Sequence, residues 1–160
     1  MRAPATKLST LGLLLSGLVL ASAAAAATPP PVKIASLDKL PAAVQETVRA
    51  QSAGATIRGM SKETGEDGKP VYEIEMTIKG LAKDINVGED GTVLVSEQQV
   101  TLDALPPAVR ATILKSAGTR KIRMIESVTK LGAPAYFEAQ VMTGKKLTEI
   151  EVAADGSLMH

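Results

Sequence analysis

The sequence predicts an α+β fold made of two tandem units, each with one helix packed on a three- or four-stranded antiparallel sheet. Residues 37–95 and 102–160 align without a gap at an offset of 65 residues. Within each copy, apolar residues first recur every four positions and then every two, which is the change expected between a helix and strands. Because a repeated pattern indicates a repeated structure, we expect both copies to fold alike.

The first 27 residues have the pattern of a secretory signal peptide: basic residues, an apolar stretch and a run of alanines. Cleavage after Ala25 and cleavage after Ala27 both fit the small-residue rule, so the site stays open. An uncleaved anchor is the alternative, because residues 8–27 reach the roughly 20 residues that span a bilayer. The serines, glycines and alanines favour cleavage. We expect a periplasmic or secreted protein with no stable membrane insertion after cleavage.

Charge and composition exclude some partners. Without Arg2 and Lys7, 16 of the 18 basic residues remain against 17 acidic ones. Tyr72, Tyr136 and Phe137 are the only aromatic residues. A near-neutral chain with so few stacking groups lacks what nucleic-acid binding uses. The absence of cysteine leaves apolar burial to hold the exported chain together.

Two short segments separate the expected parts. Residues 28–36 contain three consecutive prolines, which predict an extended spacer. Residues 96–101 are expected to form a short connector between the unit at 37–95 and the unit at 102–160. The connector is too short for a flexible tether, so we expect the units to share an interface.

Each unit is expected to open with a helix. Pro41 and Pro106 stand where a helix can begin, because the first turn leaves the N–H of such a residue unpaired. Apolar residues four apart, such as Leu40 and Val44, form one stripe. The helices are expected to end before Gly54 and Gly118.

Strands follow each helix. Residues 72–78 alternate apolar and polar side chains, which indicates a strand with one buried face, and residues 136–143 are its counterpart. Asp-Gly pairs predict hairpin turns. The other expected strands lie near residues 56–63, 83–87, 92–96, 121–128 and 148–152, with a stub at 157–159.

The sheet face opposite the helices is the expected contact surface, because a helix covers one face only. Apolar Met60, Ile125 and Met142 among charged neighbours indicate a binding face. The alternative is that the two sheets pack together, or that a shift of one residue turns these side chains inward. The proposed partner-binding residues are Arg58, Met60, Glu73, Glu75, Arg123, Ile125, Glu138, Gln140 and Met142.

No catalytic, cofactor or metal site is expected. The chain has no cysteine, and His160, its one histidine, is the last residue. The acidic turns lack the spacing of a calcium-binding loop and are explained by turn geometry. Glu73 and Glu138 occupy equivalent positions in different copies, where they are expected to pair with Arg58 and Arg123. The sequence therefore predicts a protein without enzymatic activity.

The order of motifs over residues 37–160 resembles the PepSY and PepSY-like families. These motifs are Leu-Pro-x-Ala-Val, Ile-Arg, a Tyr-Glu-Ile-Glu strand and a final Asp-Gly turn. The PepSY-like branch is similar to beta-lactamase inhibitory protein, and PepSY units also occur in propeptides of thermolysin-like proteases. The resemblance implies binding or inhibition without chemistry and identifies no cofactor.

We therefore expect a non-catalytic binding module whose open sheet face engages an envelope protein of unknown identity and restrains a protease or other hydrolase. One alternative is a periplasmic protein that binds a small ligand or a metal between its units. Another is an envelope structural protein that self-associates through its sheet edges. The sequence leaves open the oligomeric state and the relative orientation of the units.

Overall fold

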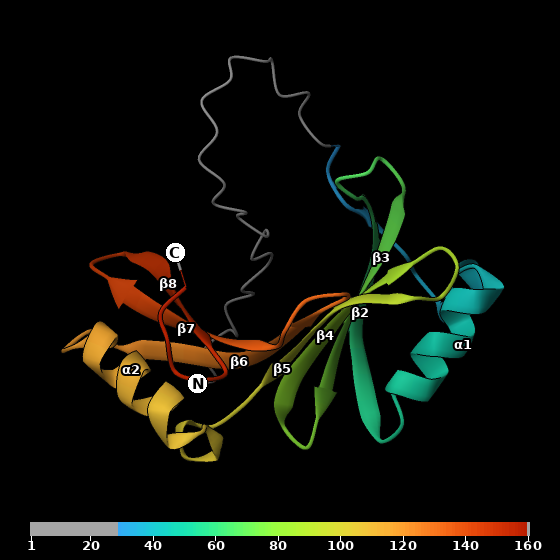
Figure 1. The fold of residues 1–160 in the computed structure, drawn as a ribbon. Coiled ribbons are helices and arrows are strands. Elements are labelled where there is room, and N and C mark those ends of the chain that lie inside the picture. Colours follow the sequence, from blue (N-terminus) through green and yellow to red (C-terminus); the bar gives the residue numbers. More distant parts are fainter. Residues whose placement is uncertain (1–28, 160) are drawn as a thin grey trace, which may run out of the picture.

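The computed structural model describes residues 29–159, which form one eight-stranded antiparallel sheet and two helices (Figure 1). The strands lie side by side in chain order, from β1 to β8. Short 3-10 turns at Leu37–Lys39 and Leu102–Ala104 precede the helices. The elements are β1 (Val32–Lys33), α1 (Ala42–Gln51), β2 (Ala55–Thr64), β3 (Pro70–Ile78), β4 (Leu81–Gly88), β5 (Val93–Gln99), α2 (Pro107–Ala117), β6 (Ile122–Lys130), β7 (Tyr136–Thr143) and β8 (Lys146–Ala153).

The prediction of two tandem units, each a helix on its own three- or four-stranded sheet, is wrong. β5 pairs with β6 in a register that runs from Val95 opposite Lys130 to Gln99 opposite Glu126. Residues 96–99 of the expected connector therefore belong to a central strand. Two separate sheets would each leave an edge of unpaired backbone groups at this point, and the β5–β6 pairing removes both edges.

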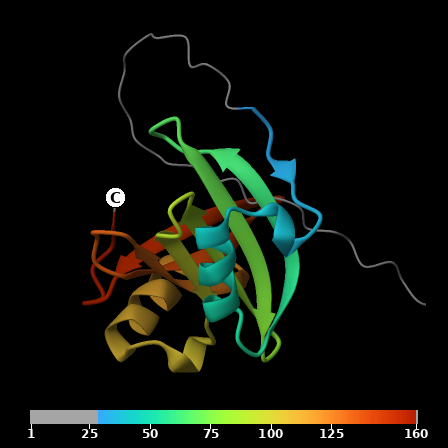
Figure 2. The same ribbon diagram turned by 90° about the vertical axis from the view of Figure 1, so that its right-hand side faces the viewer.

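Both helices pack on the same face of the sheet and cover its two ends. α1 lies against the half built from β2 to β5 and α2 against the half built from β6 to β8 (Figure 2). Val44 and Val48 of α1 and Val109 and Ile113 of α2 are fully buried. Each helix thus closes its own hydrophobic core against the strands, and the β5–β6 ladder joins the two halves.

The final Asp-Gly turn of each repeat packs on its helix in the same way. Thr47 Oγ1 donates to the carbonyl oxygen of Gly91 at 2.6 Å, and Thr112 Oγ1 donates to that of Gly156 at 2.7 Å. Gly91 has φ +85°, and a Cβ there would lie 2.8 Å from the backbone oxygen of Ala43. Glycine is therefore required by the backbone angle and by the close approach of the helix.

Two predictions concern the amino-terminal end: a signal peptide at residues 1–27 and an extended spacer at residues 28–36. The expected signal peptide at residues 1–27 lies outside the described residues. Within the expected spacer, Val32 and Lys33 form β1 and pair with Lys62 and Ser61 of β2, so this part adds an edge strand. Among residues 29–159, no helix has both the length and the apolarity to cross a membrane.

A β-bulge occurs at the same place in both repeats. The pairing shifts between Ile57 and Gly59 in β2, and between Ile122 and Met124 in β6. The residues inside the shifts are Arg58 and Arg123. A bulge inserts one extra residue and so reverses which later side chains face each side of the sheet. This reversal decides which residues lie opposite the helices.

Candidate functional site

The sheet face opposite the helices, here named the open face, is lined by acidic side chains. Paired residues of neighbouring strands share a face, so the ladders place these side chains together. Asp84 lies opposite Glu75 and Glu97, and Glu138 lies opposite Glu126 and Glu151. We name this row across β3 to β8 the carboxylate band: Glu73, Glu75, Asp84, Glu97, Glu126, Glu138, Glu149 and Glu151.

Three members of the band converge at its centre, where β4, β5 and β6 lie side by side. One carboxylate oxygen from each of Asp84, Glu97 and Glu126 lies within 4.8 Å of the others. Glu126 has only 5% of its surface exposed. Such close carboxylates repel one another unless a proton or a cation lies between them.

The pKa values of the band follow from this arrangement. Burial, and then the charges of Glu97 and Asp84, raise the pKa of Glu126 to about 7. Burial, and then the charge of Glu63, raise the pKa of Glu73 to about 6. Burial is also the first cause of the raised pKa of Asp84, Glu97 and Glu138. The face therefore favours partners that carry positive charge.

Arg58 is the cation that contacts the band within residues 29–159. Its guanidinium donates from Nη2 to Asp84 Oδ1 at 2.9 Å and lies 3.6 Å from Glu75 Oε2. It also donates from Nε to the carbonyl oxygen of Met76 at 3.0 Å. No ion pair reaches Glu97, Glu126 or Glu138 in this part of the chain. Most of the band's charge therefore has no internal partner.

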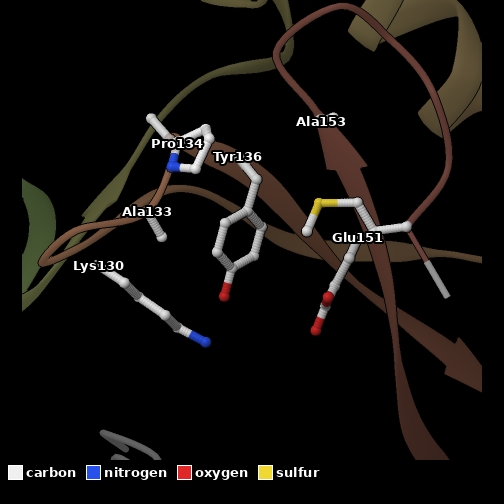
Figure 3. Close-up of a pocket in the computed structure, with 8 residues that line it drawn as sticks. Lys130, Ala133, Pro134, Tyr136, Glu151 and Ala153 are labelled. Carbon is white, nitrogen blue, oxygen red and sulfur yellow. The ribbon is translucent and has the colours of Figure 1, made fainter.

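A shallow apolar pocket of about 310 Å³ lies beside the band, at the end of β6, β7 and β8 (Figure 3). The Lys130 Nζ is 5.2 Å from the centre of the Tyr136 ring. Figure 3 shows the charged ends of Lys130 and Glu151 extending in the same direction as the Tyr136 hydroxyl. The pocket is lined by Lys130, Ala133, Pro134, Ala135, Tyr136, Glu151, Ala153 and Met159.

The structure brings together some of the residues that the sequence proposed for this face. Arg58, Glu73 and Glu75 lie together in the amino-terminal half, where Arg58 contacts Glu75. The other residues placed on the open face are Glu138, Gln140 and Met142 of β7. The role of these residues in binding a partner stays a prediction.

Two residues proposed for the open face lie on the helix side instead. Ile125 has 5% of its surface exposed and belongs to the core beneath α2. Met60 packs against the core beneath α1. Arg123 is exposed at the bulge of β6. The reason is the bulge, since uninterrupted alternation would place Met60 with Arg58 and Ile125 with Arg123.

Sequence reasoning missed the centre of the band. Asp84 lies on an expected strand whose faces were not assigned, and Glu97 lies in the segment that was expected to be a connector. Glu126 lies on the strand in which the bulge exchanges the two faces. Its neighbour Ser127 pairs with Phe137 on the helix side. The available signal was the Ile-Arg pair, which recurs in both copies. A bulge lies at this pair in β2 and in β6, and apolar and polar side chains alternate regularly between the two faces only after it.

Comparisons with known proteins identify the fold. No family model matches the sequence, and no curated protein matches it. Similar solved structures are a BLIP-like protein from Bacteroides fragilis (20% identity, TM-score 0.57, 74% of this chain and 82% of that one) and a DUF2874 family protein from Bacteroides ovatus (17%, 0.61, 77% and 86%). A proposed periplasmic protein from Bacteroides eggerthii is also similar (15%, 0.62, 76% and 86%). The chain therefore has a BLIP-like fold.

Proposed function

We propose that this chain is a non-catalytic, exported binding protein that uses its open face to dock on a protein of the bacterial envelope. The observation that carries the proposal is the placement of both helices on one side of a continuous sheet. The opposite side is left to acidic side chains whose charges are mostly unpaired within residues 29–159. The likeness to a proposed periplasmic protein supports an envelope location.

The partner presents a basic contact surface to the carboxylate band and, beside it, an apolar side chain that enters the pocket. Lysine or arginine side chains would neutralise the carboxylate band, and charge complementarity of this kind also steers association. An apolar side chain of the partner would enter the pocket at Tyr136 and Met159. Aromatic and apolar anchors of this kind supply much of the binding energy in protein interfaces.

The partner that we favour is a protease or another hydrolase of the envelope, which the docked protein would restrain. The support is the BLIP-like fold together with the resemblance of residues 37–160 to PepSY-like proteins. The band offers no positioned nucleophile and base, so the function requires binding and no chemistry of its own.

The test is cross-linked capture from an envelope extract with three forms of the protein. The wild type should retain a partner whose cross-links fall on β3 to β8, and Glu138→Lys should reduce its capture at least 10-fold. Glu138 is surrounded by carboxylates, so a lysine there should relieve repulsion and leave the fold intact. Glu46→Lys is the matched control, because Glu46 is exposed on α1 at the other side of the molecule.

Retention of the partner by Glu138→Lys, or equal loss with Glu46→Lys, would exclude the open face as the contact surface. Failure of the wild type to retain any partner would exclude a stable envelope complex. Circular dichroism of each variant confirms that the fold is kept. A captured hydrolase is then assayed with increasing amounts of the purified protein, and unchanged activity would exclude restraint.

A further inference from the structure

The centre of the carboxylate band has the geometry of a cation site. Asp84 of β4 lies directly opposite Glu97 of β5, and Glu126 reaches them from β6. Their three oxygens lie within 4.8 Å of one another, although they come from three different strands. Carboxylates on an open sheet face are free to point away from one another into water. These three converge instead, which brings negative charges close together and is unfavourable without a cation or a proton between them.

Glu126 supplies a second and independent observation. It has 5% of its surface exposed, and neither a cation nor a hydrogen-bond donor of residues 29–159 contacts its carboxylate. A buried carboxylate is normally paired or bound to a metal, because its desolvation is costly. Glu126 therefore lacks a positive partner at the point where two other carboxylates converge.

Gln140 on the neighbouring strand β7 also lacks a partner. It lies on the open face opposite Glu149, has 5% of its surface exposed, and its Nε2 has no hydrogen-bond acceptor. Buried side-chain donors without an acceptor are uncommon. The strand register pairs Gln140 with Met124 and Glu149, so this amide is a separate unsatisfied donor of the open face.

The chemistry of the three ligands selects the type of cation. Carboxylate oxygens suit hard cations such as Ca²⁺ and Mg²⁺, whereas zinc and copper prefer nitrogen and sulfur ligands. Two ligands of Ca²⁺ can be up to about 5 Å apart, since each lies about 2.3–2.6 Å from the ion. For Mg²⁺, at about 2.1 Å, the limit is about 4.2 Å. A spread of up to 4.8 Å fits the larger ion.

Arg58 contacts one oxygen of Asp84. Its contact at 2.9 Å is with Oδ1 of Asp84, and a carboxylate has a second oxygen with its own lone pairs. Three ligands are fewer than the six to eight oxygens that Ca²⁺ takes, so waters would complete the coordination. A site with so few protein ligands belongs to the weak class, with a Kd of about 10⁻⁴ to 10⁻³ M as in extracellular modules.

We propose that Asp84, Glu97 and Glu126 together bind one divalent cation of the size of Ca²⁺, with waters completing its coordination. The site is a property of the isolated protein and does not depend on the proposed docking function. Its occupancy would reduce the negative charge at the centre of the open face.

The test is isothermal titration of the purified protein, treated with EDTA and dialysed, with CaCl₂, MgCl₂ and NaCl at matched ionic strength. One Ca²⁺ should bind with a Kd of about 10⁻⁴ to 10⁻³ M, more tightly than Mg²⁺. Glu126→Gln and Glu97→Gln should each raise this Kd at least 10-fold. Glu151→Gln, on the same face but outside the three ligands, should leave it within about twofold.

Two results would overturn the proposal. One is the absence of calcium heat and of a calcium-dependent melting shift up to about 10 times the upper end of that Kd range. The other is calcium binding that is not specific to the three ligands. It would appear as an equal rise in the calcium Kd for Glu126→Gln, Glu97→Gln and Glu151→Gln, or as equal heats from NaCl and CaCl₂, and would identify diffuse screening of the band. Two ligand variants are used so that a folding defect in one leaves the test intact. Partner capture is measured separately, so its failure does not affect this outcome.

Discussion

The bulge in β6 makes a sharp prediction about two adjacent residues, Met124 and Ile125. Ile125 lies in the core beneath α2 with 5% of its surface exposed, whereas Met124 lies opposite Gln140 on the open face. Replacing Ile125 by glutamine removes about 2–3 kcal/mol of apolar burial. It also buries an amide without a partner, which costs about 1–3 kcal/mol. Ile125→Gln should therefore lower the free energy of unfolding by about 4 kcal/mol.

Met124→Gln is the matched control, because it places the same side chain one residue away on the half-buried open side. We expect its free energy of unfolding to change by less than about 1 kcal/mol. Urea denaturation followed by circular dichroism measures both variants. A loss of about 4 kcal/mol is a large part of the 5–15 kcal/mol typical of a domain, so the difference is easily resolved. Equal losses, or a larger loss for Met124→Gln, would refute the position of the bulge and the assignment of the open face.

Three further predictions follow from the turns and from the charge of the open face. Gly91→Ala should cost about 3 kcal/mol in urea denaturation, because its Cβ meets the Ala43 backbone at φ +85°. Gly68→Ala, at φ +78° with open space around it, should cost about 1 kcal/mol, and equal costs would contradict the turn–helix packing. The raised pKa of Glu73, about 6 against an ordinary 4.5, stabilises the fold below pH 4.5, and this stability is lost as pH rises through 6. Its size is about 1–2 kcal/mol, because solvent screens this partly exposed group. Glu73→Gln should lack that loss between pH 4.5 and 7.5, and identical pH profiles of the two proteins would contradict it. Partner capture should weaken several-fold between 50 and 300 mM NaCl, about the range over which exposed charges are screened, and salt-independent capture would argue against a basic partner.

The elements themselves were largely predictable from local pattern. Residues 136–143 were predicted as a strand, and the structure places β7 at those residues. The Asp-Gly turns at Gly68, Gly91 and Gly156 have the positive φ that their sequence requires. Alternation, proline and glycine act over a few neighbouring residues, so each is visible in one sequence. The Lys79–Gly80 turn was missed, because lysine gives no such signal although it adopts φ +50°.

The candidate site was less predictable. Glu73, Glu75 and Glu138 were assigned to the open face, where the structure places them, but Ile125 and Met60 were assigned there wrongly. Both wrong assignments have the same cause. Each bulge reverses which side chains after Arg58 or Arg123 face the helices. The convergence of carboxylates from three strands depends on how β4, β5 and β6 pair with one another. The alternation pattern within a single strand does not contain this information.

The sequence by itself determined the repeat, the two helices and the Asp-Gly turns, because these depend on neighbours along the chain. Only the tertiary structure decided that β5 pairs with β6 to make one sheet, and which side chains lie opposite the helices. Strand pairing joins residues far apart in sequence, and its energy comes from removing exposed edges over the whole molecule. The meeting of Asp84, Glu97 and Glu126 is a consequence of that pairing.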